Sequence, residues 1–135
     1  MDSPLERLEV LYEEWGRGDF SREIFDAETV HGGFGWVDMD QEIRGAEQIR
    51  DAMRGWMSAW EDPVAVEADD FIEAGDRILV LIRWRGRGKG SGVEMESEGA
   101  HLWTFRDGRV ARFDVYRDRE QAQAAVARED PDGEA

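Results

Sequence analysis

The sequence predicts an α+β domain in which helices pack on one face of a curved antiparallel sheet. Apolar residues recur at helical spacing in the first 60 residues, and from Val64 onward the period changes to about two, which is typical of strands. A chain of 135 residues without an internal repeat has the size of one domain. Because the helices come first and the strands follow, they should form separate layers.

Three helices are expected before the strands. Ser3, Pro4 and Glu6 form a capping box with proline at the first helical position, and this helix ends near Gly16. Asp19 can cap a short second helix through about residue 25. A third helix follows Gly45 and ends before Pro63, with an apolar stripe formed by Ile49, Met53, Trp56, Met57 and Trp60.

The pattern in the second half of the sequence predicts a meander of four strands over residues 64–73, 78–85, 93–105 and 110–116. Asp107 and Gly108 are a strong hairpin signal between the last two strands. Asp118 then caps an alanine-rich helix that ends at about Arg128. The domain is therefore expected to span residues 1–129, followed by a disordered acidic tail at 130–135.

Composition excludes several classes of protein. There is no cysteine, which excludes disulfide scaffolds and thiolate nucleophiles, and the formal charge of −15 opposes binding to nucleic acid or anionic membranes. No metal-ligand spacing is present, and residues 86–92 lack the spacing of a phosphate-binding loop, so no cofactor or metal is expected. The longest apolar run is too short to span a bilayer and the N-terminus does not resemble a signal peptide, which predicts a cytoplasmic protein.

Four segments in this order carry a resemblance to a known family. They are GDF after the first helix, IRGAEQIRDAM, AGDRILVLIRWRGRGKGSG and WTFRDGRVARFDVYRDREQA. Together they resemble the SnoaL-like branch of the nuclear-transport-factor-2-like superfamily. The resemblance implies a cone-shaped barrel with a strongly curved sheet, an apolar cavity at its wide end, and a homodimer. Its members include polyketide cyclases, isomerases, dehydratases, hydrolases and proteins without catalysis, so it does not specify an activity.

Parity along the strands predicts which side chains face the cavity. In the strand over 93–105 the odd positions should point inward, because Glu94, Glu96 and Glu98 could hardly be buried together. In the preceding strand the resemblance puts Leu79, Leu81 and Arg83 on the cavity side. Val80, Ile82 and Trp84 would then face outward and form a dimer surface. The last strand should send Ala111, Phe113 and Val115 inward.

His101 is the main catalytic candidate, because a pocket imidazole can act as acid, base or hydrogen-bond donor. The alternative is a hydrogen-bonded structural histidine. Relative to ketosteroid isomerase, the catalytic aspartate is replaced by Gly32, and Tyr12 lies about one residue out of register with the isomerase tyrosine. The resemblance therefore disfavours steroid isomerisation.

Other polar candidates each have two interpretations. Arg83, if inward, either recognises an anionic ligand group or pairs with an internal carboxylate. Asp38 and Asp40 are candidate general bases, or else solvated or capping residues. His31 either contacts the ligand or is an ordinary polar loop residue.

Many aromatic residues should converge on one interior, where most form the core. The same composition suits a cavity for a planar or fused-ring compound. The candidate ligand-binding aromatics are Tyr12, Trp36, Trp56, Trp60 and Trp103. The sequence thus predicts a pocket protein that binds or converts an apolar, ring-containing metabolite by cofactor-free acid/base chemistry. The alternative is a non-catalytic dimeric binding or interaction module whose cavity is filled.

Overall fold

The computed structural model describes residues 3–33 and 42–128 of the chain. The elements follow the order α1 (Pro4–Gly16), β1 (Val30–Gly33), β2 (Ile43–Arg44), α2 (Ala46–Met57), β3 (Trp60–Ala74), β4 (Arg77–Gly88), β5 (Glu94–Arg106), β6 (Arg109–Tyr116) and α3 (Arg119–Arg128). Trp36, Asp38, Asp40 and the predicted tail at 130–135 lie outside the described residues.

Helix α1 forms as its capping box predicts. The Ser3 hydroxyl accepts from the backbone N–H of Glu6, and the Glu6 carboxylate accepts from that of Ser3 at 2.9 Å. The helix buries one apolar stripe against the sheet, consisting of Leu8, Leu11, Tyr12 and Trp15. The cap therefore fixes where the helix begins, and the stripe fixes which face turns to the core.

Two helix predictions are wrong in detail. Residues 19–25 form no helix, although Ile24 and Phe25 are buried as expected. The Asp19 carboxylate accepts from the backbone and hydroxyl of Ser21, which satisfies it in a local turn, and so short a helix would not repay its nucleation cost. Helix α2 ends at Met57, so Trp60 is the first residue of β3 and not part of the helical stripe.

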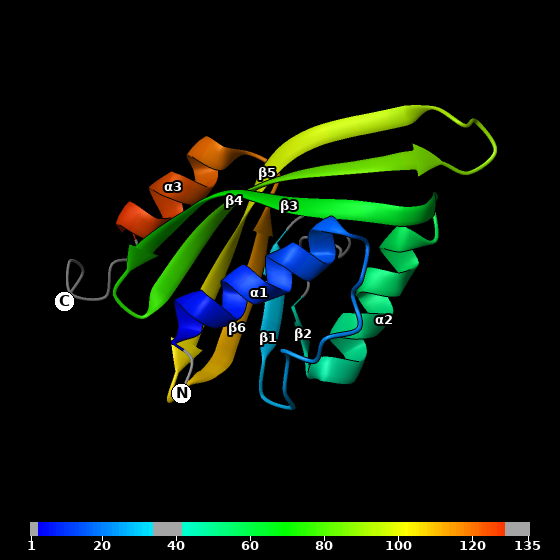
Figure 1. Cartoon of the computed structure of the whole chain (residues 1–135). Coiled ribbons are helices and arrows are strands. Elements are labelled where there is room, and N and C mark those ends of the chain that lie inside the picture. Colours follow the sequence, from blue (N-terminus) through cyan, green and yellow to red (C-terminus); the bar gives the residue numbers. More distant parts are fainter. Residues whose placement is uncertain (1–2, 34–41, 129–135) are drawn as a thin grey trace.

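The sheet is mixed, with strand order β2-β1-β6-β5-β4-β3. The predicted antiparallel meander from β3 to β6 is confirmed. Strand β1, which pairs parallel with β6, was not expected, because glycines fill half of its four residues. Figure 1 shows the sheet curling around α1, with α3 on the opposite face. Strands β4 and β5 project beyond β6, because β5 pairs with β6 only from Ala100 onward.

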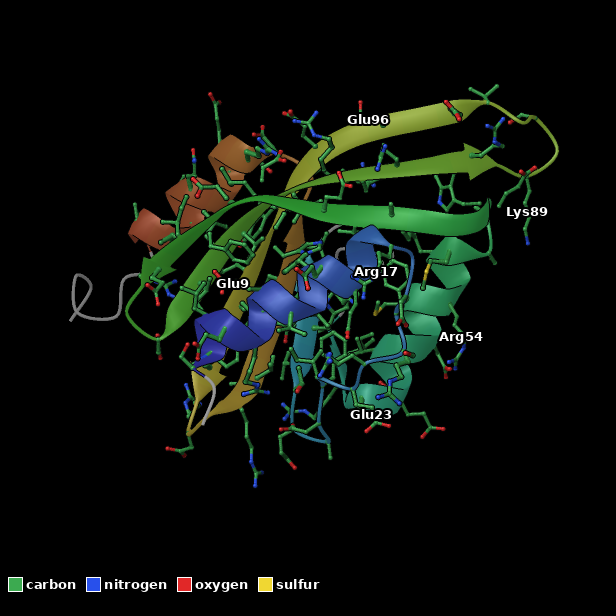
Figure 2. The ribbon with its side chains drawn as sticks, in the orientation of Figure 1. Glu9, Arg17, Glu23, Arg54, Lys89 and Glu96 are labelled. Atoms are coloured by element: carbon green, nitrogen blue, oxygen red, sulfur yellow. The ribbon has the colours of Figure 1, made fainter. Side chains whose placement is uncertain are left out.

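The parity of β5 agrees with the prediction. His101 and Trp103 are buried on the inner face, whereas Leu102 packs in the outer cluster. Residues 94–98 are all exposed, odd and even positions alike, so the alternation is visible only in the part of β5 that the core covers. Figure 2 shows Glu96 on the projecting part of β5, away from α1 and α2. This inner face packs against α1 and forms the main core.

The predicted parity of β4 is wrong. Val80 lies directly opposite His101 and Ile82 opposite Gly99, and directly opposed residues of neighbouring strands share a face. Val80, Ile82 and Trp84 therefore belong to the inner core, while Leu79, Leu81 and Arg83 lie on the outer face. The start of β4 is apolar on both faces because α3 covers the outer one, where Leu79, Ala100 and Leu102 pack on Ala122. The predicted outward patch of Val80, Ile82 and Trp84 does not exist.

Within the described residues, no helix is long and apolar enough to cross a membrane.

Candidate functional site

A pocket of about 320 Å³ opens on the inner side of the sheet, where β6 ends and the β4–β5 hairpin continues. Its lining is mainly apolar and combines α2 with four strands. The lining residues are Trp56, Trp60, Val66, Ile82, Trp84, Met95, Ser97, Glu98, Gly99, His101, Val115, Tyr116 and Arg117. A larger hollow of about 690 Å³ near Arg17, Glu61 and Arg87 is an open surface with charged walls. The smaller pocket is the better candidate for a ligand site.

Three tryptophans from different elements meet in the pocket wall. The ring centroids of Trp60 and Trp84 lie 5.1 Å apart and those of Trp56 and Trp84 lie 5.3 Å apart, both edge to face. The third pair, Trp56 and Trp60, is 6.1 Å apart. Gly86 on β4 admits this cluster, because a Cβ there would lie 3.2 Å from the Trp60 ring. The result is a rigid aromatic wall in which each ring is held by the other two.

His101 enters the pocket lining from the middle of β5 and is only 3% exposed. Its Nδ1 lies 2.5 Å from the hydroxyl of Tyr12 on α1, and the same hydroxyl accepts from Trp103 Nε1 at 2.9 Å. An indole nitrogen can only donate, and no other acceptor for the Tyr12 hydroxyl exists among the described residues. Tyr12 therefore donates to His101 Nδ1, which assigns the proton of the neutral imidazole to Nε2.

Burial keeps this imidazole uncharged. Desolvation lowers the pKa of His101 from 6.5 to about 3, with a further contribution from His31. Burial likewise raises the pKa of Tyr12 well above its usual range. At neutral pH both groups are thus neutral, and His101 is a hydrogen-bond donor and a weak base.

His31 lies in β1 and is fully buried. Its Nδ1 lies 2.7 Å from the backbone carbonyl oxygen of Phe113, to which it donates, and its ring stacks on the Phe113 ring at 5.0 Å. Desolvation lowers its pKa. The interpretation of His31 as an ordinary polar loop residue is wrong, because His31 belongs to a strand and is buried in the core. It does not line the pocket.

Arg83 does not face the cavity, contrary to its predicted side. On the outer face it lies 3.3 Å from Asp69 and 3.5 Å from Glu98, and Arg119 contacts the same two carboxylates. A register shift in β3 at Asp69 accompanies this arrangement. The Arg119 hydrogen bond and the two guanidinium charges hold the pKa of Asp69 below its usual range. The cluster is a partly exposed ion-pair network.

The structure brings together some of the predicted site residues and separates others. His101, Trp56 and Trp60 line one pocket, while Tyr12 and Trp103 lie behind His101 and orient it. Trp84 and Arg117 were not predicted as site residues. The register of β4 against β5 would have revealed Trp84, whereas Arg117 had no signal in the sequence. Within residues 3–33 and 42–128, no group of three or more potential ligand side chains could hold a metal ion.

Several solved structures share this fold at low sequence identity. TerC, co-crystallised with polyporic acid, superposes with a TM-score of 0.69 at 16% identity, covering 91% of this chain and 97% of TerC. A protein from Jannaschia sp. CCS1, described as a SnoaL-like polyketide cyclase, gives 0.68 at 19% identity, covering 94% and 96%. A protein from Catenulispora acidiphila with a ketosteroid isomerase-like fold, in complex with trimethylamine, gives 0.66 at 18% identity, covering 93% and 95%.

At such identities these structures establish the fold and leave the ligand open. A search of curated protein sequences finds no significant match. The family model of the SnoaL-like domain matches residues 8–113, which include α1 from Leu8 onward, the meander up to Phe113 and the residues that orient His101. The chain belongs to the SnoaL-like domain family.

Proposed function

We propose that the protein binds a small, apolar, ring-containing metabolite in the pocket between the three tryptophans and His101. One observation carries the proposal: a rigid aromatic wall and a neutral, oriented imidazole line the same cavity of about 320 Å³. Aromatic walls with few polar groups suit flat apolar ligands, and the volume lies at the lower end of the range for small-molecule sites.

In this proposal His101 donates its Nε2 hydrogen to an oxygen of the ligand. The Tyr12 hydroxyl holds Nδ1, so the ring is oriented before the ligand arrives. A neutral imidazole donor can stabilise negative charge that develops on a carbonyl oxygen without itself changing protonation. Catalysis would then be cofactor-free, with His101 as the polarising donor and Asp38 or Asp40 as the base.

Isothermal titration with tetralone, a neutral fused-ring ketone, tests the binding proposal. Trp84→Leu removes part of the aromatic wall and should weaken binding roughly tenfold, on the scale of one lost aromatic contact. Phe71→Leu is the matched control, because Phe71 lies on the inner side but does not line the pocket. If tetralone and other fused-ring ketones or phenols do not bind the folded protein, the proposal is wrong.

A second candidate is a non-catalytic dimeric module. It is favoured by the filled centre of the cone, where Trp103 and Phe113 have no exposed surface and His101 is already hydrogen-bonded. The outer face offers Leu81 and Tyr116, both partly exposed beside α3, as a surface for a second copy. Sedimentation velocity should then show a dimer that Leu81→Lys dissociates. A clean monomer at micromolar concentration would exclude this candidate.

A further inference from the structure

Three strands of the sheet continue past the point where β6 ends, because β6 pairs with β5 only from Ala100 onward (Figure 1). We call this part of the sheet the extension, and it consists of residues 60–68 of β3, 83–88 of β4 and 94–98 of β5. The pocket lies across the boundary between the extension and the rest of the sheet. Trp60 and Trp84 of the aromatic wall belong to the extension, whereas His101 does not. The position of the extension therefore sets how far the aromatic wall lies from the imidazole.

Strand pairing is irregular on both sides of this boundary. At the boundary Ile82 of β4 pairs with Gly99 of β5, and both residues line the pocket. On the β3 side the register shifts between Ala68 and Asp70, so Asp69 is an extra residue in that strand. On the other side β6 has ended, and no strand that the structure describes pairs with Gly99 there. Because a sheet bends at bulges, the ladder alone does not fix the angle of the extension.

Arg119, the first residue of α3, reaches the boundary from the outer face. Its Nη2 donates to the carbonyl oxygen of Ile82 at 2.8 Å and to the carboxylate of Asp69 at 2.6 Å, and its Nε donates to the carbonyl oxygen of Gly99 at 3.2 Å. The Asp118 carboxylate caps α3, which fixes where the helix begins. One planar guanidinium with donors in fixed directions thus joins all three strands where their pairing is irregular.

We propose that Arg119 is a positioning residue for the ligand pocket, because it holds the extension at the angle at which the aromatic wall and His101 contact one ligand. The inference rests on the proposed function, since it concerns the same pocket. Arg119 does not belong to the lining and acts through Ile82 and Gly99, which do. Loss of its guanidinium should let the extension move relative to His101, which lowers the affinity without removing any ligand contact.

Arg83 provides a matched control for Arg119. It lies on the same outer face and pairs with the same two carboxylates, those of Asp69 and Glu98. Within the described part of the chain, its hydrogen bond goes to Asp69 and none goes to a carbonyl oxygen of the lining. Arg83→Gln therefore removes one charge from the same network of ion pairs, while the hydrogen bonds of Arg119 to the boundary remain.

Isothermal titration with tetralone measures the effect of Arg119 on binding. Arg119→Gln should weaken binding about three- to tenfold, which is the scale for a residue that acts on a site without touching the ligand. Arg83→Gln should change the affinity by less than about twofold, since it removes only partly exposed ion pairs. Arg119→Lys keeps the charge and loses the planar fork, so it should not restore the affinity of the wild type.

Amide hydrogen exchange, followed by mass spectrometry without any ligand, gives a second measurement. In Arg119→Gln, exchange should become faster in peptides that cover the extension, because the extension is held less firmly. Peptides from α1 and from the β5–β6 turn should exchange as in the wild type. In Arg83→Gln, the peptides of the extension should also exchange as in the wild type.

The outcomes separate this inference from the proposed function. If Arg119→Gln binds tetralone as tightly as the wild type does, the positioning role is overturned and the ring-binding pocket stands. Equal weakening in Arg83→Gln, or full recovery in Arg119→Lys, would reduce the effect to charge and would also overturn it. Faster exchange in every peptide would mean that Arg119 only stabilises the fold. If tetralone does not bind the wild type, the loss counts against the proposed function, and unchanged exchange of the extension in Arg119→Gln would overturn the role of Arg119 separately.

Discussion

Tyr12→Phe removes one hydroxyl that two buried groups share. The phenyl ring still fills its place, so little apolar contact is lost. Trp103 Nε1 loses its acceptor and His101 Nδ1 loses its donor, and both residues are at most 3% exposed. Each unsatisfied buried group costs about 1–3 kcal/mol, so the two groups together predict a loss of about 2–6 kcal/mol in the free energy of unfolding. For a domain of this size the melting temperature should fall by roughly 8–24 °C.

Urea denaturation followed by tryptophan fluorescence measures this loss, with the slope of the transition compared between variants. A double-mutant cycle with His101→Leu isolates the Tyr12–His101 hydrogen bond from the rest, and the coupling should be about 1–2 kcal/mol. Two results would refute the hydrogen-bond chain from Trp103 through Tyr12 to His101. One is a free energy of unfolding of Tyr12→Phe within about 0.5 kcal/mol of the wild type, and the other is a pair of single mutations whose effects on that free energy are additive.

Three further predictions concern stability. Burial lowers the pKa of His101 to about 3 and also lowers that of His31 in the folded state, so the unfolded chain binds more protons below pH 6.5. The free energy of unfolding, measured by urea denaturation, should therefore fall as pH drops from 6.5 toward 3, by up to roughly 1.4 kcal/mol per pH unit from His101 alone. Gly99→Ala should cost about 1–3 kcal/mol by thermal melting, because its Cβ would lie 2.7 Å from the Tyr116 carbonyl oxygen. Asp69→Asn should cost about 1 kcal/mol or less, since its ion pairs are partly exposed; a loss several times larger would mean that the network is structural.

The local signals in the sequence predict most of the elements. The capping box at Ser3, the Asp107–Gly108 turn and the cap at Asp118 all appear where expected, because each depends on a few neighbouring residues. The odd-numbered inward face of β5 also follows from local chemistry, since three alternating glutamates need water. Strand β1 could not be predicted, because its pairing with β6 joins segments about 80 residues apart.

The faces of β4 show what a single sequence cannot provide. Both faces are apolar at its start, so the alternation of side chains does not show which face points inward. Only the register against β5 assigns Val80 to the core and Leu79 to the outer face. The family resemblance puts Arg83 on the cavity side and Trp84 on the exterior, and the register reverses both. Arg117 follows the end of β6, where no periodic pattern exists, and its place in the pocket depends entirely on tertiary structure.

The most direct test of the account is the tautomer of His101 and its response to a ligand. The chain has two histidines, so ¹⁵N-histidine labelling and a His31→Gln variant assign both rings in long-range ¹H–¹⁵N spectra. At neutral pH, His101 should be a neutral imidazole with its proton on Nε2, and addition of tetralone should shift Nε2 while Nδ1 stays bonded to Tyr12. A proton on Nδ1, a charged ring, or an Nε2 signal that does not move when tetralone saturates the pocket would contradict the account.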